Sequence, residues 1–454
     1  MTALERRAVS SLALLYSFRM LGLFMVLPLL ALYAADLPDA TPSLIGLALG
    51  IYGLTQAMLQ IPLGWLSDQV GRKPVIVGGL LLFAAGSVVA ALADSLWGIV
   101  LGRALQGAGA IAATVMALVA DLTSEEQRTK AMAIVGVSIG LSFAVALVLG
   151  PVIAAAGGLT SVFWVTGLLA LGGIAIVLLL VPSPATAPVE HDDLGASPGM
   201  FGRALRDPTL LRLNFGVFSL HFILMACFLV VPGVLERVAG VDRAHHWQVY
   251  LPVLLLSIVG MLPLMRMAER GGLPQQTFLS GIALLVAAVL VLGTAAGPWV
   301  FFFGLWLFFV GFNYLEATLP SLVSKSVFAG GKGTALGIFS TCQFLGAFAG
   351  GAGGGWVFQH FGQAYLIGLC LAFAGLWFVF MLGAGSVPVP QPESASVKLW
   401  SAFDRRRRRH QNTLACLSPE RRRPWRRCVS TTSWRCAGND VLCDGFCKHR
   451  SLSS

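Results

Sequence analysis

The sequence GWLSDQVGRKP occupies residues 64–74 and joins two apolar runs, 43–66 and 74–93. Each run is long enough to cross a bilayer as a helix, which takes about 20 residues. Pro74 suits the first turn of a helix, because its missing N–H would have no intrahelical partner there. Arg72 and Lys73 add positive charge at this boundary. The stretch is therefore expected to be a short polar loop between two membrane-spanning helices.

Apolar runs of this kind recur along most of the chain. Of its 454 residues 56% are hydrophobic and only 11% are charged, whereas a soluble domain carries about 25% charged residues. This composition excludes a cytosolic enzyme, a secreted disulfide scaffold and a disordered chain. It predicts an all-α polytopic membrane protein with twelve transmembrane helices. The expected runs are 9–33, 43–66, 74–93, 96–120, 131–155, 161–181, 211–234, 248–265, 276–296, 299–323, 334–357 and 364–385.

A linker rich in Pro, Ala, Gly, Asp and Arg, residues 182–210, divides these runs into two sets of six. Short strings recur between the sets at an offset of about 200 residues: FMVLP at 24–28 returns as FLVVP at 228–232. Two repeated bundles around a central site are the architecture of alternating-access transporters. We therefore predict pseudo-symmetric six-helix bundles at 1–181 and 211–385, followed by a basic tail at 386–454.

The distribution of basic residues predicts the orientation, because cytoplasmic loops of membrane proteins are enriched in Lys and Arg. With the N-terminus in the cytoplasm, only Arg237 and Arg243 fall on the opposite side. Both termini and the linker are therefore expected in the cytoplasm of a cell with an inner membrane. The basic residues on the cytoplasmic side would be Arg6, Arg7, Arg72, Lys73, Arg128, Lys130, Arg203, Arg206, Arg212, Arg266, Arg270, Lys325 and Lys332.

The loop at 64–74 resembles the loop signature of the major facilitator superfamily, Gly-x-x-x-Asp-x-x-Gly-Arg-Lys/Arg. The resemblance extends over most of residues 1–385. The strings RMLGLFMVLP at 19–28, GIYGLTQA at 50–57 and LNFG at 213–216 resemble most strongly the YajR-type transporters, a group similar by motif to drug:proton antiporters. The resemblance implies a secondary transporter with the two-bundle fold. Every fixed position of the signature is filled, by Gly64, Asp68, Gly71, Arg72 and Lys73.

Two further strings resemble signatures of the same superfamily. RALQGAGA at 103–110, in the fourth run, includes Arg103, Gln106 and Gly107. ALVLGPVIAA at 146–155, in the fifth run, keeps Gly150 and Pro151 of a motif typical of drug:proton antiporters, although alanine replaces three of its glycines. The small residues that remain still allow close packing of helices.

Glu316 is an acidic residue well inside an expected membrane helix, in the polar string FNYLE that also contains Asn313. An ionisable group at such depth is costly unless it faces protein or water. Because burial disfavours the charged form of a carboxyl group, Glu316 is a candidate proton carrier in a polar cavity. The alternative is a structural Glu316 that is fixed in an ion pair.

Three basic residues also lie within apolar runs. Arg19 is a candidate counter-charge for Glu316, or a group that attracts anions into the cavity. Arg103 is expected to be structural, and the family resemblance implies that its hydrogen bonds also influence proton release. His221 is interpreted as a hydrogen-bonded core residue or, alternatively, as part of the proton-coupling site.

Asp68 would lie at the C-terminus of its helix, where a carboxylate opposes the helix dipole. It becomes favourable if the N-terminus of another helix faces it, and the eleventh run begins nearby, at about Lys332. We expect Asp68 to act in closure between the halves, the alternative being a solvated loop residue. A glycine-rich stretch in the same eleventh run, 346–355, indicates either a sliding seam between the halves or dense static packing.

The tail carries 14 of the 31 Lys and Arg residues but only 5 of the 21 Asp and Glu, so nearly all of the net charge of +10 lies there. One interpretation is a lipid-binding polybasic segment. A second is a zinc site at Cys436, Cys443, Cys447 and His449, although the spacing is irregular. A third, which fits the Arg, Cys and Trp enrichment best, is translation out of frame from about residue 397.

The function predicted from these features is proton-coupled efflux of small amphipathic compounds, with uptake of a small metabolite as the alternative. No HExxH or phosphate-binding Gly-x-x-x-x-Gly-Lys motif occurs, so enzymatic activity and ATP-driven pumping are not expected. The expected partners are a small-molecule substrate, protons and the lipid bilayer, without nucleic acid. No cofactor or metal is expected, because the adjacent His245 and His246 are too few ligands for a metal site. The protein is expected to act as a monomer.

Overall fold

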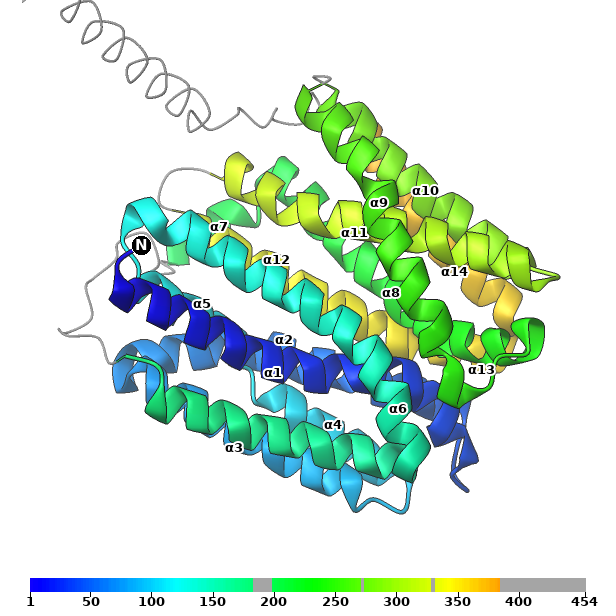
Figure 1. The fold of residues 1–454 in the computed structure, drawn as a ribbon. Helices are drawn as coiled ribbons and strands as arrows, with labels where there is room; N and C mark the ends of the chain where they lie inside the picture. The colour runs from blue at the N-terminus through cyan, green and yellow to red at the C-terminus, as the bar shows by residue number, and fades with distance from the viewer. Residues whose placement is uncertain (183–197, 271–272, 328–330, 384–454) are drawn as a thin grey trace, which may run out of the picture. The chain divides into compact units, whose positions relative to one another are not determined.

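The computed structural model describes residues 1–182, 198–270, 273–327 and 331–383. All regular structure in these residues is helical. The predicted all-α fold class is therefore confirmed for the part of the chain that is described (Figure 1). Residues 183–197 of the proposed linker (182–210) and the whole proposed tail (386–454) lie outside the described residues, and with them the interpretations given to the tail.

The first half of the chain contains six helical elements of α type. Its α4 and α5 together take the place of the single expected run 96–120. Their bounds are α1 (Ala3–Tyr33), α2 (Pro42–Val70), α3 (Arg72–Ala91), α4 (Leu96–Ala108), α5 (Ala112–Asp121) and α6 (Glu125–Leu179), with a short 3-10 turn at Ala34–Asp36 after α1.

The second half begins with the short helix α7, which forms inside the stretch expected to be only a linker. The eleventh expected membrane run of the chain is formed by three elements in succession: α12, a π-helical turn named η3, and α13. The bounds are α7 (Pro198–Ala204), α8 (Pro208–Ala239), the 3-10 turn η2 (Arg243–His245), α9 (Trp247–Arg270), α10 (Pro274–Thr294), α11 (Pro298–Ser326), α12 (Lys332–Phe348), η3 (Ala349–Gly353), α13 (Gly354–Phe361) and α14 (Gln363–Leu382).

Local sequence explains where these helices begin. Thr41 accepts a hydrogen bond from the backbone N–H of Leu44, and Pro42 follows it in the first turn of α2. Asp207 accepts from the N–H groups of Thr209 and Leu210 at the start of α8, again with a proline next in sequence. Such side chains satisfy backbone donors that have no partner inside the helix.

The element α6 accounts for two membrane crossings. Eleven helical segments are long and apolar enough to cross a membrane, and one of them spans 54 residues, about 80 Å at 1.5 Å per residue. Its helical geometry is interrupted at Gly157 and Gly158, where Gly158 has a φ of 65°. Ser161 Oγ donates to the carbonyl oxygens of Ile153 and Gly158 at this bend. The described residues therefore contain twelve apolar crossings, as predicted.

The fourth crossing differs from the expectation, because it is broken at residues 109–111 between α4 and α5. Gly109 donates its backbone N–H to the carbonyl oxygens of Leu105 and Gln106, which tightens the last turn of α4. A Cβ on Gly109 would run into the carbonyl oxygen of Gly79 on α3. The break therefore occurs where the two backbones approach closely.

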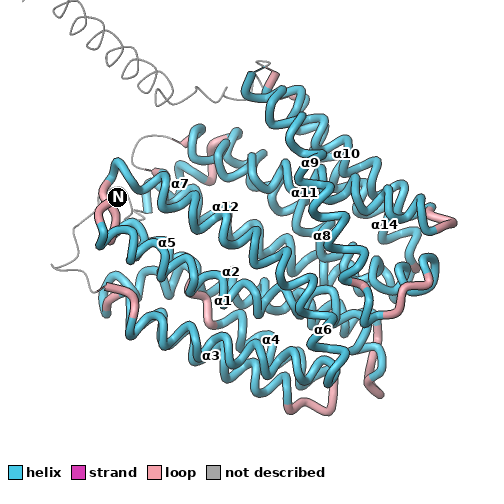
Figure 2. The backbone as a smooth tube through the Cα atoms, in the orientation of Figure 1, coloured by secondary structure: helices cyan, strands magenta, loops and turns pink. Residues whose placement is uncertain are grey.

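The helices run between two ends of the bundle. We call the end that carries the start of α1 the terminal end, and the end with the α1–α2 connection the loop end; they lie to the left and right in Figure 1. Figure 2 shows connecting loops gathered at these two ends.

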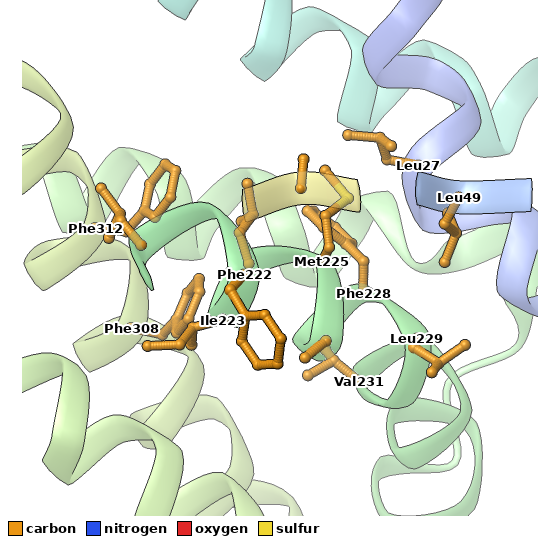
Figure 3. Close-up of a cluster of buried hydrophobic side chains, with 14 of the residues drawn as sticks. Leu27, Leu49, Phe222, Ile223, Met225, Phe228, Leu229, Val231, Phe308 and Phe312 are labelled. Carbon is orange, nitrogen blue, oxygen red and sulfur yellow. The ribbon is translucent and has the colours of Figure 1, made fainter. Parts of the chain in front are cut away.

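The two halves share a hydrophobic core toward the loop end. One cluster of buried side chains includes Leu27 of α1 and Leu49 of α2 together with Met225 and Phe228 of α8 (Figure 3). A second cluster lies toward the terminal end and draws its buried members from the first half alone, among them Leu12 of α1. The halves are therefore packed together at the loop end more continuously than at the terminal end.

Candidate functional site

Backbone contacts bring the two halves together along α2. A Cβ on Gly50 would lie 2.7 Å from the carbonyl oxygen of Phe348, and one on Gly53 would lie 2.6 Å from that of Phe344. A Cβ on Gly46 would run into the carbonyl oxygen of Gly351, in the π-helical turn. We call this line of contact between α2 and the composite α12–η3–α13 the glycine seam. Glycine is required there because any side chain would separate the backbones.

Polar contacts extend the glycine seam toward both ends. At the loop end the backbone N–H of Ser43 donates to Gln359 Oε1 at 3.0 Å. Deeper in, Gln60 Nε2 donates to Thr341 Oγ1 at 2.7 Å, and Ser340 Oγ donates to Gln60 Oε1 at 3.3 Å. The side chain of Gln60 is thus held between two hydroxyl groups of α12.

An ion pair links the connections at the loop end. Arg243, in η2, contacts Asp36 at 2.9 Å and Glu236 at 3.3 Å between nitrogen and oxygen. Its guanidinium also lies over the ring of Tyr33, 5.2 Å from the centroid. Because Tyr33 and Asp36 belong to the first half, Arg243 joins the halves here.

In the loop motif at the terminal end, Arg72 makes its ion pairs within the first half. Arg72 forms ion pairs with Asp68 and with Asp121, the latter at 3.0 Å, and donates to Ser67 Oγ. Lys73 Nζ donates to the carbonyl oxygen of Val181 at 2.6 Å. The Asp68 side chain is 54% exposed. Asp68 therefore lies beside Arg72 here, and its expected contact with the start of α12 is absent from the interactions of the described residues.

The glycines of the loop motif at 64–74 and of the fifth-run motif at 146–155 allow a turn and close helix packing. Gly71 has a φ of 97° and links α2 directly to α3, and Gly64 has only the side chain of Ala113 within reach of an added Cβ. A Cβ on Gly150 would lie 3.1 Å from the carbonyl oxygen of Met25, so α6 and α1 pack closely beside Pro151.

Arg103 belongs to a satisfied hydrogen-bond chain inside the first half. It is 1% exposed, and it donates to Gln106 Oε1 at 2.9 Å and to the carbonyl oxygen of Ala48 at 3.4 Å. Gln106 Nε2 in turn donates to Ser87 Oγ at 2.9 Å. A Cβ on the next residue, Gly107, would run into the backbone carbonyl of Tyr52. Both hydrogen bonds of Arg103 therefore stay within the first half.

Glu316 lies in a polar cluster of the second half with Gln343 and His221. Gln343 Nε2 is 2.8 Å from His221 Nε2 and 3.2 Å from Glu316 Oε1, and His221 Nε2 is 3.8 Å from Glu316 Oε2. His221 Nδ1 is 3.1 Å from the carbonyl oxygen of Val217. Donation by Nδ1–H to that carbonyl would leave Nε2 to accept from the Gln343 amide. Glu316 remains 38% exposed at its side chain.

Asn313 lies one turn before Glu316 but has a different partner. Its side-chain amide donates to Ser257 Oγ of α9 at 2.9 Å. Ser257 itself is buried and donates to the carbonyl oxygen of Leu254. Asn313 therefore links α11 to α9 beside the polar cluster that contains Glu316. Among the described residues it makes no hydrogen bond to Glu316.

Arg19 lies in the first half, and the structure does not bring it into contact with Glu316. It is 1% exposed, and its Nη2 donates to Tyr52 Oη at 2.9 Å, to Gln56 Oε1 at 2.7 Å and to the carbonyl oxygen of Gly109 at 3.3 Å. The hydrogen bond to the Gly109 carbonyl oxygen connects Arg19 to the break between α4 and α5. The partner that sequence reasoning assigned to Glu316 is thus replaced by His221 and Gln343.

The two polar clusters lie on opposite sides of the glycine seam. The ring of Tyr52, which contacts Arg19, packs edge-on against Phe344 with 6.4 Å between ring centroids. Phe344 is the neighbour in sequence of Gln343, which contacts Glu316. Sequence reasoning assigned no role to Tyr52, Gln56, Gln60 or Gln343, although a glutamine in an apolar run is the same kind of signal as Glu316.

No group of three or more His, Cys, Asp or Glu side chains that could hold a metal ion occurs among the described residues. Two cavities there are small and apolar. One of about 40 Å³ lies between α8, α10, α11 and α14 and includes Cys227 and Cys370 in its lining. The functional candidates are therefore the two polar clusters beside the glycine seam.

Comparison with known proteins gives one consistent result. Residues 12–351 match the family model of the Major Facilitator Superfamily. The chain is 50% identical over 401 residues to the inner membrane transport protein YajR of Escherichia coli K12, with 88% of this chain and 87% of that protein covered. It is 26% identical to the multidrug resistance protein MdtH of Aeromonas salmonicida, covering 80% of this chain and 91% of that protein.

Solved structures share the fold at lower identity. The human organic anion transporter MFSD10 superposes with a TM-score of 0.61 at 21% identity, covering 84% of this chain and all of that one. A bacterial homologue of the human lysosomal transporter Spinster, in an inward-facing and occupied conformation, gives a TM-score of 0.65 at 13% identity, covering 84% and 97% of the two chains.

Proposed function

The chain belongs to the major facilitator superfamily, and from this premise we propose that it is a proton-coupled antiporter that exports small amphipathic compounds by alternating access. Its similarity to a transport protein of an inner membrane and its twelve apolar crossings make it a multi-pass membrane transporter. The proton coupling, the direction of transport and a monomeric state belong to the proposal. So does an orientation with both termini in the cytoplasm.

The contacts between the halves support alternating access. The glycine seam, the Arg243–Asp36 ion pair and the shared hydrophobic core all join the halves toward the loop end. At the terminal end the ion pairs of Arg72 in the loop motif stay within the first half. With the orientation favoured by the basic residues, this is a state closed toward the outside. The opposite state requires the seam to part and the terminal end to close.

The observation that carries proton coupling is the cluster of Glu316, Gln343 and His221. The Glu316 side chain is 38% exposed, and in the proposed mechanism this exposure is the route by which water reaches its carboxyl group. Gln343 is on α12, the same helix whose Ser340, Thr341 and Phe344 contact α2 across the seam. A proton on Glu316 removes the charge that holds the Gln343 amide and turns the carboxyl group into a donor. The protonation state of Glu316 is thereby linked to the helix that closes the seam.

Substitution of Glu316 by Gln tests this proposal in inverted membrane vesicles with a pH-sensitive dye and a panel of amphipathic compounds. We expect Glu316→Gln to abolish proton-driven accumulation while substrate exchange without a gradient continues. The matched control is Glu126→Gln, at an exposed acidic residue of the terminal end. Proton-driven transport by Glu316→Gln at the rate of the control would overturn Glu316 as the carrier.

The direction of transport has its own readout in the same vesicles. Export from a cell corresponds to uptake into inverted vesicles, so compounds that accumulate inside them and release protons from their lumen support efflux. Similarity to MdtH, a multidrug resistance protein, favours this direction. Accumulation only in right-side-out vesicles would instead establish the uptake of a metabolite.

A further inference from the structure

Arg19 is a buried cation whose hydrogen bonds come from a single nitrogen. All three of its hydrogen bonds are made by Nη2, whereas Nε and Nη1 are buried and lack any partner among the described residues. No described carboxylate lies within ion-pair distance of it. A guanidinium has five N–H donors in a fixed fork, and most of this fork is unused.

Arg103 provides a direct comparison in the same half. Both arginines are 1% exposed, yet no buried side-chain nitrogen of Arg103 lacks a hydrogen-bond partner. Arg103 also lies over the ring of Tyr52, 4.9 Å from the centroid. The unused donors of Arg19 are therefore a property of this position and not of every buried arginine in the bundle.

The surroundings of Arg19 add a further donor and no negative charge. Gln56, which accepts from Arg19 through Oε1, is fully buried and leaves its own Nε2 without a partner. Burying a charge without compensation costs several kcal/mol even in a membrane protein. Buried N–H donors that lack partners around a single cation would all be satisfied by an oxyanion. A carboxylate in particular can accept two parallel hydrogen bonds from one guanidinium group.

The walls near this cation are aromatic. Arg19 lies 5.9 Å from the centroid of the Phe83 ring. Tyr52, bonded to Arg19, packs against Phe344 across the seam. Tyr52 therefore contacts both the Arg19 guanidinium and the second half across the seam. An aromatic ring with a carboxylate group suits both features.

We propose that Arg19 and Gln56 form a binding site for the carboxylate of the transported compound, so that the substrates are aromatic organic acids. This inference rests on the proposed transport function and names its substrate class. Tyr52 covers the site in the present state, and its hydrogen bond to Arg19 is exchanged for the substrate carboxylate when the site fills.

Three probes of similar shape test the inference on the purified full-length protein in detergent: benzoate, neutral benzamide and cationic benzylamine. We expect benzoate to raise the melting temperature in a saturable manner, whereas benzamide, benzylamine and sodium sulfate at equal ionic strength do not. Equal stabilisation by benzamide, by benzylamine or by sulfate, or none by benzoate, would overturn the inference. This comparison uses the unmodified chain and needs no variant to fold.

Variants then locate the site. Arg19→Gln is expected to weaken benzoate binding by about tenfold or more, since a hydrogen-bonded charge is lost. Arg19→Lys keeps the charge but loses the fork, and a weakening of about fivefold is expected because the second parallel hydrogen bond is absent. Arg237→Gln, at an exposed arginine near the end of α8, is the control. Unchanged benzoate affinity in Arg19→Lys and in Arg19→Gln would place the binding elsewhere.

This experiment separates the inference from the proposed function, because it uses no proton gradient. If benzoate fails to bind while another compound is still transported in exchange for protons, only the assignment of the substrate class is wrong. If benzoate binds through Arg19 but no transported compound is coupled to protons, only the antiport mechanism is wrong.

Discussion

Arg243 of η2 reaches Asp36 in the α1–α2 connection, with 2.9 Å between Nη1 and Oδ2. The pair joins the two halves at the loop end, where the Arg243 side chain is 33% exposed and that of Asp36 is 66% exposed. An exposed ion pair of this kind stabilises by about 0.2–1 kcal/mol. Such an energy does not fix a state, but it shifts the balance between two states several-fold.

The first prediction concerns this pair. Arg243→Glu replaces its attraction by repulsion from Asp36 and Glu236, so we expect a higher population of the state open at the loop end. Distances between spin labels on the two halves, measured by double electron–electron resonance, check this. The double variant Asp36→Arg/Arg243→Glu should restore part of the original distribution, and Arg237→Glu should leave it unchanged. Identical distributions in Arg243→Glu and the unmodified protein would contradict the role of the pair.

The second prediction concerns the glycine seam. Gly50→Ala adds one Cβ that would lie 2.7 Å from the carbonyl oxygen of Phe348 and 3.1 Å from its Cα, and backbone atoms cannot move aside as a side chain can. We expect the variant to insert into the membrane but to lose most transport, because the halves no longer close at the loop end. Gly78→Ala is the control, since a Cβ there meets nothing within 4 Å. Equal transport rates in the two variants would show that the seam tolerates a side chain.

The third prediction concerns Asp68. Its side chain is half-exposed beside Arg72 in this state, so Asp68→Asn should change the melting temperature little. If Asp68 faces the N-terminus of α12 when the terminal end closes, the same variant should lower turnover more than substrate affinity. Asp121→Asn also removes an ion pair from Arg72 and is the matched control, expected to retain turnover. A change in affinity alone would contradict the closure role.

The fourth prediction concerns the basic tail. Truncation after Gln391 should leave membrane insertion and transport intact, since the sequence beyond it has no apolar periodicity with which to pack against the bundle. Expression, melting temperature and vesicle transport of the truncated chain provide the measurement. Loss of the folded membrane body on truncation would show that the tail contributes to it.

The sequence predicted the twelve crossings because length and hydropathy alone decide them. It did not predict the break between α4 and α5, which arises where Gly109 meets the backbone of Gly79, a contact between distant segments. The bend at Gly157 and Gly158 falls in the gap expected between two runs, since two crossings need a reversal between them.

The partners of the buried charges were harder to predict than their positions. Arg19 and Glu316 were both placed inside the membrane from sequence, but a helix that is apolar on every side gives no indication of which face turns inward. The rotation of α1 directs Arg19 to Tyr52 and Gln56, and that of α11 directs Glu316 to Gln343 and His221. Polar residues missed by the sequence reasoning, such as Gln343, complete these clusters.

The glycine seam has a consequence for the speed of switching between states. Long side chains that interlock at an interface lose rotamer freedom on closing, at up to about 2 kcal/mol each. Glycines have no rotamers, so at Gly46, Gly50 and Gly53 contact forms and breaks without any side-chain search. In the proposed alternating-access cycle, each closure at these positions therefore returns to the same register without sorting among alternative rotamers.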